Sequence, residues 1–168
     1  ARVHLQVDIG FGDAITPAPE EVVFPTLLDS PAPKFRAYPK ETVVSEKLEA
    51  MVQLGMANSR MKDFYDLVVL SNLFPFDGET LVSAIRATFT RRKTPIPNDT
   101  PVALTASFTN DAGKQTQWSG FVRKSGVKDA STLPKTASSI LKFVGEPLSG
   151  AAADRQFKKQ WTPGGEWI

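Results

Sequence analysis

The chain has 168 residues, of which 41% are hydrophobic and 23% are charged, and its formal net charge is +2. These values are typical of a globular protein with one good-sized core or two small ones, and they do not favour a disordered chain. The small net charge gives no strong attraction for nucleic acid, and the absence of cysteine excludes disulfides and thiolate metal sites. A chain without cysteine also fits the cytoplasm, which is the location we expect.

The first segment, ARVHLQVDIGFGD, has the pattern of a half-buried strand. Apolar side chains alternate with polar ones from Val3 to Ile9, and glycines then permit a turn. The segment has neither an initiating methionine nor the pattern of a signal peptide, so we expect the chain to be the C-terminal portion of a longer protein. The longest apolar run, Leu67 to Leu70, is far too short to cross a bilayer, and no membrane partner is expected.

Two further short strands are predicted before the first helix. EEVVFPTLL, residues 20–28, is rich in β-branched and apolar residues, and Pro25 favours an edge or a bulge. The segment SPAPKFRAYP contains a possible short strand at Lys34–Tyr38.

From Pro39 the apolar period becomes helical. ETVVSEKLEAMVQLG predicts a helix that stops at Gly55, and a second helix is expected from a cap at Ser59 to about Leu73. A third follows in DGETLVSAIRATFTRR, with Asp77 as its N-cap. Two or three more helices are expected around Val102–Phe108, Thr116–Lys124 and Lys135–Val144.

Strands come first and helices follow, which predicts an α+β chain with a small sheet that leads into a helical bundle. We divide it into residues 1–38, which hold the sheet, and residues 39–168, which hold the helices. The C-terminal tail, FKKQWTPGGEWI, carries two of the three tryptophans, and we expect it to dock on the helices because the indole rings would otherwise be exposed.

The two first helices each carry ionisable residues on their apolar faces. On a helical wheel Asp63 lies at the centre of the apolar arc of the second helix, and Asp66 lies toward its edge. Lys47 falls inside the stripe of the first helix, and Glu41 falls on the same side, whereas Glu46 and Glu49 are predicted to face away. The pattern alone allows two interpretations. In the first, Asp63 forms a structural ion pair with Lys47 or Arg60. In the second, these charged residues form the wall of an active site.

The end of the first strand offers a further carboxylate. Asp8 lies on its polar face, just before the glycine turn, where it could hold a divalent metal or accept a proton, or simply begin the turn. His4 is the only histidine, which rules out a metal site with two histidines. The run Arg91–Lys93 reads as a basic helix end that complements the helix dipole rather than as a nucleic-acid contact.

Three motifs occur in order and together resemble one family. LQVDIGFGD, YPKETVVSEKLEAMVQLG and NSRMKDFYDLVVL are similar to the C-terminal half of the AbiEii/AbiGii nucleotidyltransferase-like toxins, from type IV toxin–antitoxin and phage-defence systems. The motifs cover Leu5 to about Leu70. The resemblance implies that the predicted strands are a partial polymerase-β-like nucleotidyltransferase sheet, followed by a mostly α-helical bundle.

The resemblance also implies roles for individual residues. Asp8 resembles the acidic residue beside the metal-binding pair and would contact the metal. Lys47 resembles the lysine that contacts the NTP phosphates. Asp63 resembles the essential aspartate of the last motif, for which the resemblance implies a general-base role. Recurrent positions around these imply phosphate-side roles for Arg60 and Lys62 and supporting roles for Glu41 and Asp66. The implied cofactor is Mg2+, the substrate an NTP, and the partners a tRNA acceptor and a cognate antitoxin.

One departure from the family pattern is important for activity. The family's first motif, a Gly-Ser followed by Asp-x-Asp, precedes the matched region, and no Asp-x-Asp occurs in this chain. We therefore expect a fragment of a nucleotidyltransferase toxin that transfers a nucleotidyl group to RNA or protein, and that does not catalyse the transfer alone. The alternative is a non-catalytic helical module that binds an antitoxin or nucleic acid, with Lys47 and Asp63 as a structural ion pair.

Overall fold

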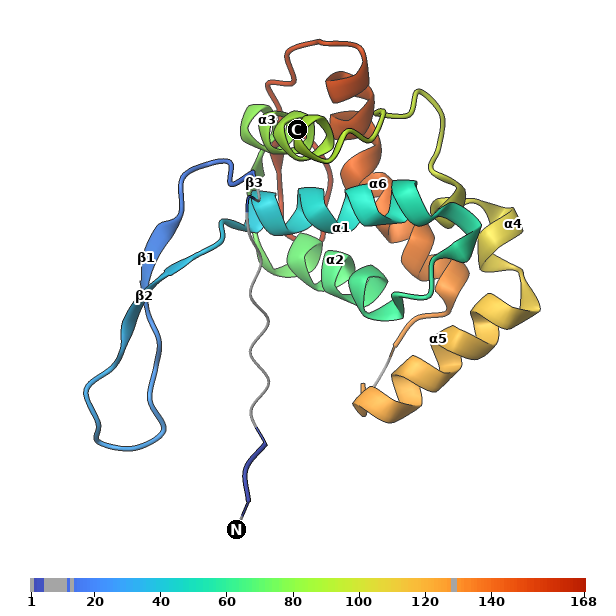
Figure 1. Ribbon diagram of the computed structural model, residues 1–168. Coiled ribbons are helices and arrows are strands. Elements are labelled where there is room, and N and C mark those ends of the chain that lie inside the picture. Colours follow the sequence, from blue (N-terminus) through green and yellow to red (C-terminus); the bar gives the residue numbers. More distant parts are fainter. Residues whose placement is uncertain (1, 5–11, 13, 128–129) are drawn as a thin grey trace.

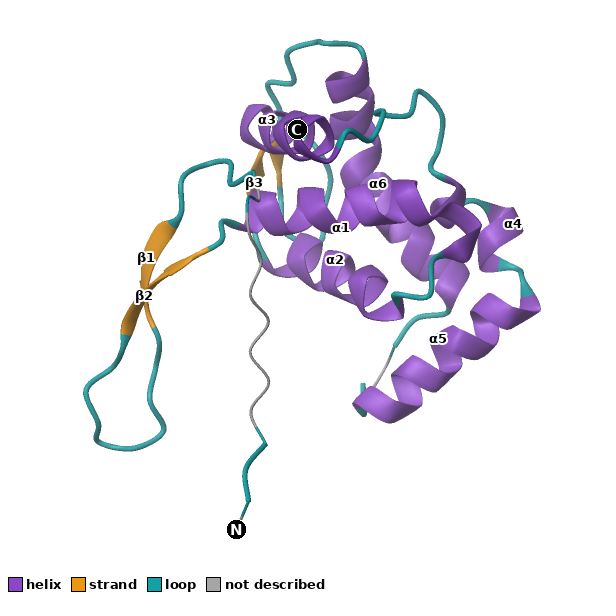
Figure 2. Cartoon of the chain, in the orientation of Figure 1, coloured by secondary structure: helices purple, strands orange, loops and turns teal. Residues whose placement is uncertain are grey.

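The computed structural model describes residues 2–4, 12, 14–127 and 130–168. The helices are α1 (Lys40–Leu54), α2 (Met61–Leu73), α3 (Gly78–Arg92), α4 (Ala106–Thr109), α5 (Ala112–Ser125) and α6 (Leu133–Ala152), with 3-10 turns at Gly55–Ala57 and Val102–Leu104. The strands are β1 (Glu20–Val23), β2 (Lys34–Ala37), β3 (Phe76–Asp77) and β4 (Gln160–Trp161). They form two antiparallel two-stranded sheets, so the predicted α+β class is confirmed, with helix predominating (Figure 2).

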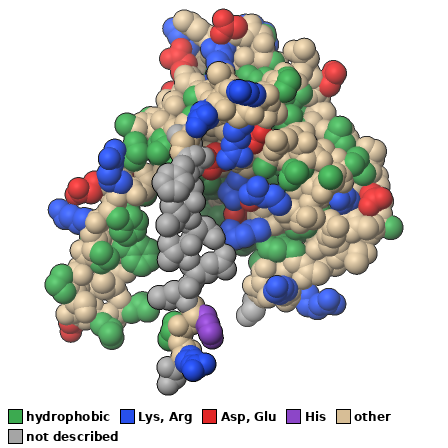
Figure 3. Space-filling model, in the orientation of Figure 1, with side chains coloured by type: hydrophobic (Ala, Val, Ile, Leu, Met, Phe, Trp, Pro, Cys, Tyr) green, Lys and Arg blue, Asp and Glu red, His purple; other side chains and the backbone are tan. Residues whose placement is uncertain are grey.

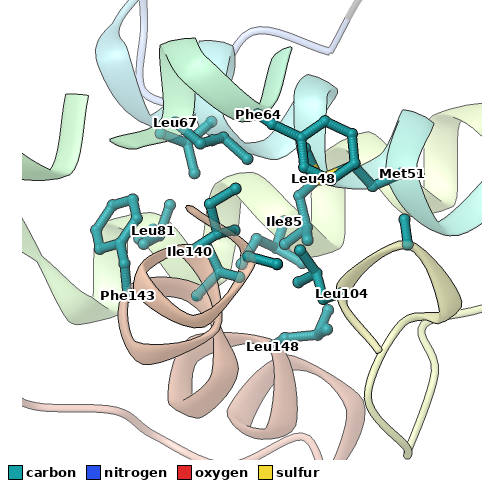
Figure 4. Close-up of a cluster of buried hydrophobic side chains, with 14 of the residues drawn as sticks. Leu48, Met51, Phe64, Leu67, Leu81, Ile85, Leu104, Ile140, Phe143 and Leu148 are labelled. Carbon is teal, nitrogen blue, oxygen red and sulfur yellow. The ribbon is translucent and has the colours of Figure 1, made fainter. Parts of the chain in front are cut away.

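The core lies where α1, α2, α3 and α6 face one another. Figure 4 shows side chains from all four helices pointing toward a common centre, joined by Leu104 of the second 3-10 turn. The largest of the fully buried side chains are Phe64, Phe76, Phe89, Phe108, Phe143, Leu48, Met51, Leu67, Leu81, Ile85, Leu133 and Ile140. Burial of such side chains is the main term that stabilises a domain of this size. Within this core, α1 packs between α2 and α3, so it is buried on more than one side (Figure 1).

The hairpin of β1 and β2 extends away from this helical body (Figure 1). Glu20 pairs with Ala37, and Val23 pairs with Lys34, which confirms both predicted strands. The connecting loop exposes several large apolar side chains, namely Phe24, Leu27 and Leu28. The strand expected from Val3 to Ile9 falls mostly outside the described residues, and the division at residue 38 stays a prediction.

The ends of the first three helices follow the sequence closely. α1 ends at Gly55, whose φ of 47° is a left-handed conformation that favours glycine. Asp77 caps α3 as predicted, because its side chain accepts a hydrogen bond of 2.8 Å from the amide of Thr80. The cap predicted at Ser59 is wrong: α2 begins after Arg60, and Asn58 accepts the hydrogen bond of the Arg60 amide.

The C-terminal tail docks on the helices, as expected from its tryptophans. β4 pairs with β3, and both Trp161 and Trp167 are buried. Trp161 donates its indole N–H to the carbonyl of Ser71 (2.7 Å), in the last turn of α2, where carbonyls lack helical partners. The tail thus completes the hydrogen bonding of the body that it covers.

The last two helices are longer than the sequence pattern predicts. α5 begins at Ala112, four residues early, because Asp111 caps it by accepting from the amide of Lys114 (2.9 Å). α6 continues through Pro147, which has no N–H for the carbonyl of Phe143. Trp167 replaces that donor, since its indole N–H lies 2.7 Å from the same carbonyl. A distant residue therefore permits a proline inside the helix. Among the described helices, none has the length and apolar character required to cross a membrane.

Candidate functional site

The candidate site lies between α1 and α2, which run side by side and are joined by a short loop (Figure 1). The inner faces of the two helices supply core residues, with Leu48 and Met51 from α1 and Phe64 and Leu67 from α2. At the outer edge of this contact the apolar residues give way to Lys47 and Asp63. Packing of the helices thus fixes the two charged side chains at the boundary between core and solvent.

Lys47 is held between two carboxylates. Its Nζ lies 2.8 Å from Asp63 Oδ1 and 2.7 Å from Asp66 Oδ2. The outer side of the cluster is basic: Arg60 Nε lies 2.7 Å from Asp63 Oδ2, and Lys62 Nζ lies 2.6 Å from Asp66 Oδ2. The structure therefore brings together five of the seven residues predicted for the site. Asp66, predicted only at the edge of the apolar arc, contacts Lys47 as closely as Asp63 does.

The cluster reaches the molecular surface on its basic side. The exposed fraction of the side chain is 6% for Asp63, 16% for Lys47 and 20% for Asp66, but 73% for Lys62. Figure 3 shows Lys and Arg side chains gathered over α1 and α2, with acidic side chains between them. The carboxylates are thus shielded by the core beneath and by basic side chains above.

For Lys47 and Asp66, the ion pairs outweigh the cost of burial, so the charged form of each residue is favoured. Burial alone would lower the pKa of Lys47, but the hydrogen bonds and negative charges of Asp63 and Asp66 raise it above the usual 10.5. Burial alone would raise the pKa of Asp66, but hydrogen bonds from Lys47 and Lys62 hold it below the usual 3.8. Lys47 is therefore a cation and Asp66 an anion throughout the neutral range.

One oxygen of Asp63 is special within the cluster. Oδ2 is buried and accepts no hydrogen bond from the described residues. It nevertheless forms the 2.7 Å ion pair with Arg60 Nε, so the charges are close while the N–H is poorly aligned. The two charges attract at this distance, although Oδ2 accepts no hydrogen bond from Arg60. Oδ2 of Asp63 is thus paired with Arg60 by charge alone.

The described cluster does not suit a divalent metal. Mg2+ needs several oxygen ligands with room for water, whereas the inner oxygens here are already bound by ammonium groups. No group of three or more potential metal ligands occurs among the residues that the structure describes. Asp8, the residue predicted to contact a metal, lies outside the described residues.

Two other expectations concern acidic residues of α1. Glu41 is buried as predicted, but it pairs with its neighbour Lys40 (2.9 Å). Glu49 was predicted to face away from the core, and this is wrong: it is fully buried, with Arg92 Nη1 at 2.9 Å. The reason is that α1 packs against α3 as well as α2, so a single apolar stripe underestimates its buried surface. Arg92, at the basic end of α3, is thus an ion-pair partner.

Sequence comparison identifies the family of the chain. The family model described as "Nucleotidyl transferase AbiEii toxin, Type IV TA system" matches residues 1–142 of the 168. The chain therefore belongs to the AbiEii nucleotidyltransferase toxin family, which confirms the resemblance carried by the three motifs. No curated protein and no solved structure matches the chain.

Proposed function

We propose that the cluster of Lys47, Asp63, Asp66, Arg60 and Lys62 forms the phosphate-side and acceptor-side half of a nucleotidyl-transfer site. The observation that carries the proposal is the position of Lys47, whose ammonium group is held by two carboxylates at a basic surface. Transfer of a nucleotidyl group releases pyrophosphate, and cations that lie close to the leaving group stabilise its developing charge.

Each residue then has a chemical task. Lys47 and Lys62 provide positive charge for the triphosphate, while Asp66 holds both ammonium groups in place. Asp63 accepts the proton of the attacking hydroxyl at Oδ2, the oxygen that accepts no hydrogen bond from the described residues. Arg60 covers that oxygen, but its side chain is more than half exposed, so it can move toward the phosphates when an NTP binds.

The substrates follow from the same proposal. An NTP is the donor, an RNA hydroxyl is the acceptor, and tRNA is the first RNA to test. A divalent metal would neutralise the phosphates, with Asp8 as its contact in this chain. We further propose a cytoplasmic location, a role in phage defence and a cognate antitoxin as partner, on the family's membership of toxin–antitoxin systems.

The 168 residues alone are proposed to bind NTP without transferring it, because they contain no Asp-x-Asp motif. The test is incubation with magnesium, labelled NTPs and total tRNA, for this chain and for the protein in which it occurs. Label should enter RNA only with the latter, and Asp63→Asn should abolish the incorporation. If the chain alone incorporates label, and Asp63→Asn abolishes that incorporation, the proposal that these 168 residues hold only half of the site is wrong.

A second candidate is a binding module in which the cluster is purely structural. Its support is that every charge in the cluster has a partner. In that case Lys47→Ala and Asp63→Ala, introduced into the protein in which this chain occurs, would leave growth inhibition intact while the protein remains folded. Under the proposed transfer reaction, both substitutions relieve the inhibition.

A further inference from the structure

A buried lysine on α5 contacts the loop that joins α1 and α2. Lys114 is only 8% exposed, although burial of an ammonium group is costly. Its Nζ donates a 2.8 Å hydrogen bond to the carbonyl of Asn58 and lies 5.1 Å from the centre of the Phe108 ring. Within the described part of the chain, no carboxylate forms an ion pair with Lys114. The charge is thus directed at one backbone carbonyl and one ring.

Asn58 is held on both its main chain and its side chain. It is fully buried, with its carbonyl bound by Lys114 and its Oδ1 accepting from the amide of Arg60 (2.8 Å). This second bond fixes which side-chain atom is the oxygen. Nδ2 is then a buried donor that finds no acceptor among the described residues. Such a group costs stability, so the favourable contribution of Asn58 comes from its two other bonds, which shape the loop.

The conformation of the loop determines the position from which the Arg60 side chain extends. The Arg60 backbone, with φ of −81° and ψ of 64°, lies near an inverse γ-turn, and the Met61 amide donates to the Ser59 carbonyl (2.9 Å). From this turn the guanidinium reaches Asp63, with Nε at 2.7 Å from Oδ2. A continuous set of contacts therefore runs from Lys114 through Asn58 and Arg60 to Asp63.

We propose that Lys114 and Asn58 are positioning residues, which fix the loop from which Arg60 reaches Asp63 and the bound triphosphate. A methionine would fill nearly the same space without desolvation of a charge. What the lysine adds is its hydrogen bond to the Asn58 carbonyl. This inference rests on the proposed function, because it assigns Arg60 to the phosphates. It adds a role for α5, a helix outside the three motifs that define the family resemblance.

The test is a double-mutant cycle on the 168-residue chain. NMR titration with each of the four NTPs gives the dissociation constant for the wild type, Lys114→Met, Asn58→Ala and Arg60→Ala, and for each of the first two variants combined with Arg60→Ala. Lys114→Met and Asn58→Ala should each weaken binding about three- to tenfold, the equivalent of one lost hydrogen bond. In the Arg60→Ala background the same changes should cost less than about twofold, because they act through Arg60. Lys124→Met, an exposed lysine on the same helix, is the matched control and should change nothing.

The Arg60 Nε resonance gives a readout that needs no NTP. Lys114→Met should shift it, and Lys124→Met should leave it in place. Equal losses of affinity with and without Arg60, or an unchanged resonance and affinity in a folded Lys114→Met, would overturn the inference. If Lys114→Met does not fold, Asn58→Ala carries the test. A wild-type chain that binds no NTP would refute the proposed function, and the resonance would then decide the positioning separately.

Discussion

Replacement of Lys47 by methionine tests the electrostatics of the site most simply. The change keeps an unbranched apolar side chain, one atom shorter, but removes the ammonium group from two carboxylates at 2.8 and 2.7 Å. Loss of one partner from a buried ion pair costs about 3–5 kcal/mol, because the other charge remains desolvated. Asp63 retains Arg60, and Asp66 retains Lys62 and is one-fifth exposed. We therefore expect a smaller loss, about 2–3 kcal/mol in the free energy of unfolding at pH 7.

The loss should depend on pH in a defined direction. The pKa of Asp66 is lowered in the folded state, so its contribution to stability is present above the usual 3.8 and is lost as the pH falls through the folded value. The pKa of Lys47 is raised, so its contribution is present below 10.5 and is lost as the pH rises through the folded value. The difference between wild type and Lys47→Met should be constant between these limits and should shrink outside them.

Urea unfolding followed by circular dichroism, at pH 3, 5, 7 and 9, measures this difference. Lys62→Met is the matched control, because it removes an exposed lysine from the same carboxylate of Asp66 and should cost less than about 0.5 kcal/mol. A Lys47→Met variant that loses as much stability at pH 3 as at pH 7 would refute the reasoning. Equal losses of stability in Lys47→Met and Lys62→Met would also refute it.

Three further predictions concern the cap of α3 and the docked C-terminal tail. Asp77→Ala removes the cap of α3 and should lower the free energy of unfolding by about 1 kcal/mol in urea. An unchanged urea midpoint would contradict that role. Trp167→Phe leaves the Phe143 carbonyl beside Pro147 without its donor and should cost about 1–3 kcal/mol. Trp161→Phe should cost less, about 0.5–1.5 kcal/mol, because the Ser71 carbonyl keeps the hydrogen bond from the Gly164 amide (2.9 Å). If neither tryptophan substitution lowers the free energy of unfolding, the tail is not docked as described.

The parts of the fold that local sequence specifies were predicted well. α1, α2 and α3 have an apolar period and clear ends, such as Gly55 and Asp77. The prediction failed where a distant residue decides. α6 passes Pro147 because Trp167, twenty-four residues after Phe143, supplies the missing donor. Glu49 is buried because α3 contacts a face of α1 that the wheel assigns to solvent.

The same distinction applies to the site. Lys47 and Asp63 could be found because a charge inside an apolar stripe is visible on a helical wheel, and the structure brings them together. Asn58 and Lys114 left no such signal. Lys114 lies on α5, fifty-six residues from Asn58 in sequence, and its direction depends on how that helix packs on the loop. The third family motif begins at Asn58, but it does not show what Asn58 does, and Lys114 lies outside the motifs altogether.

The most direct test of the proposed site is whether NTP binding by the chain depends on the triphosphate and on Lys47. NMR titration with an NTP, its nucleoside and pyrophosphate should show binding of the NTP and pyrophosphate but not of the nucleoside. Lys47→Met should weaken NTP binding by at least about tenfold, while Lys124→Met binds as the wild type does. Affinity for NTP that is equal in Lys47→Met and the wild type, in a folded protein, would contradict the assignment of this cluster to nucleotidyl transfer.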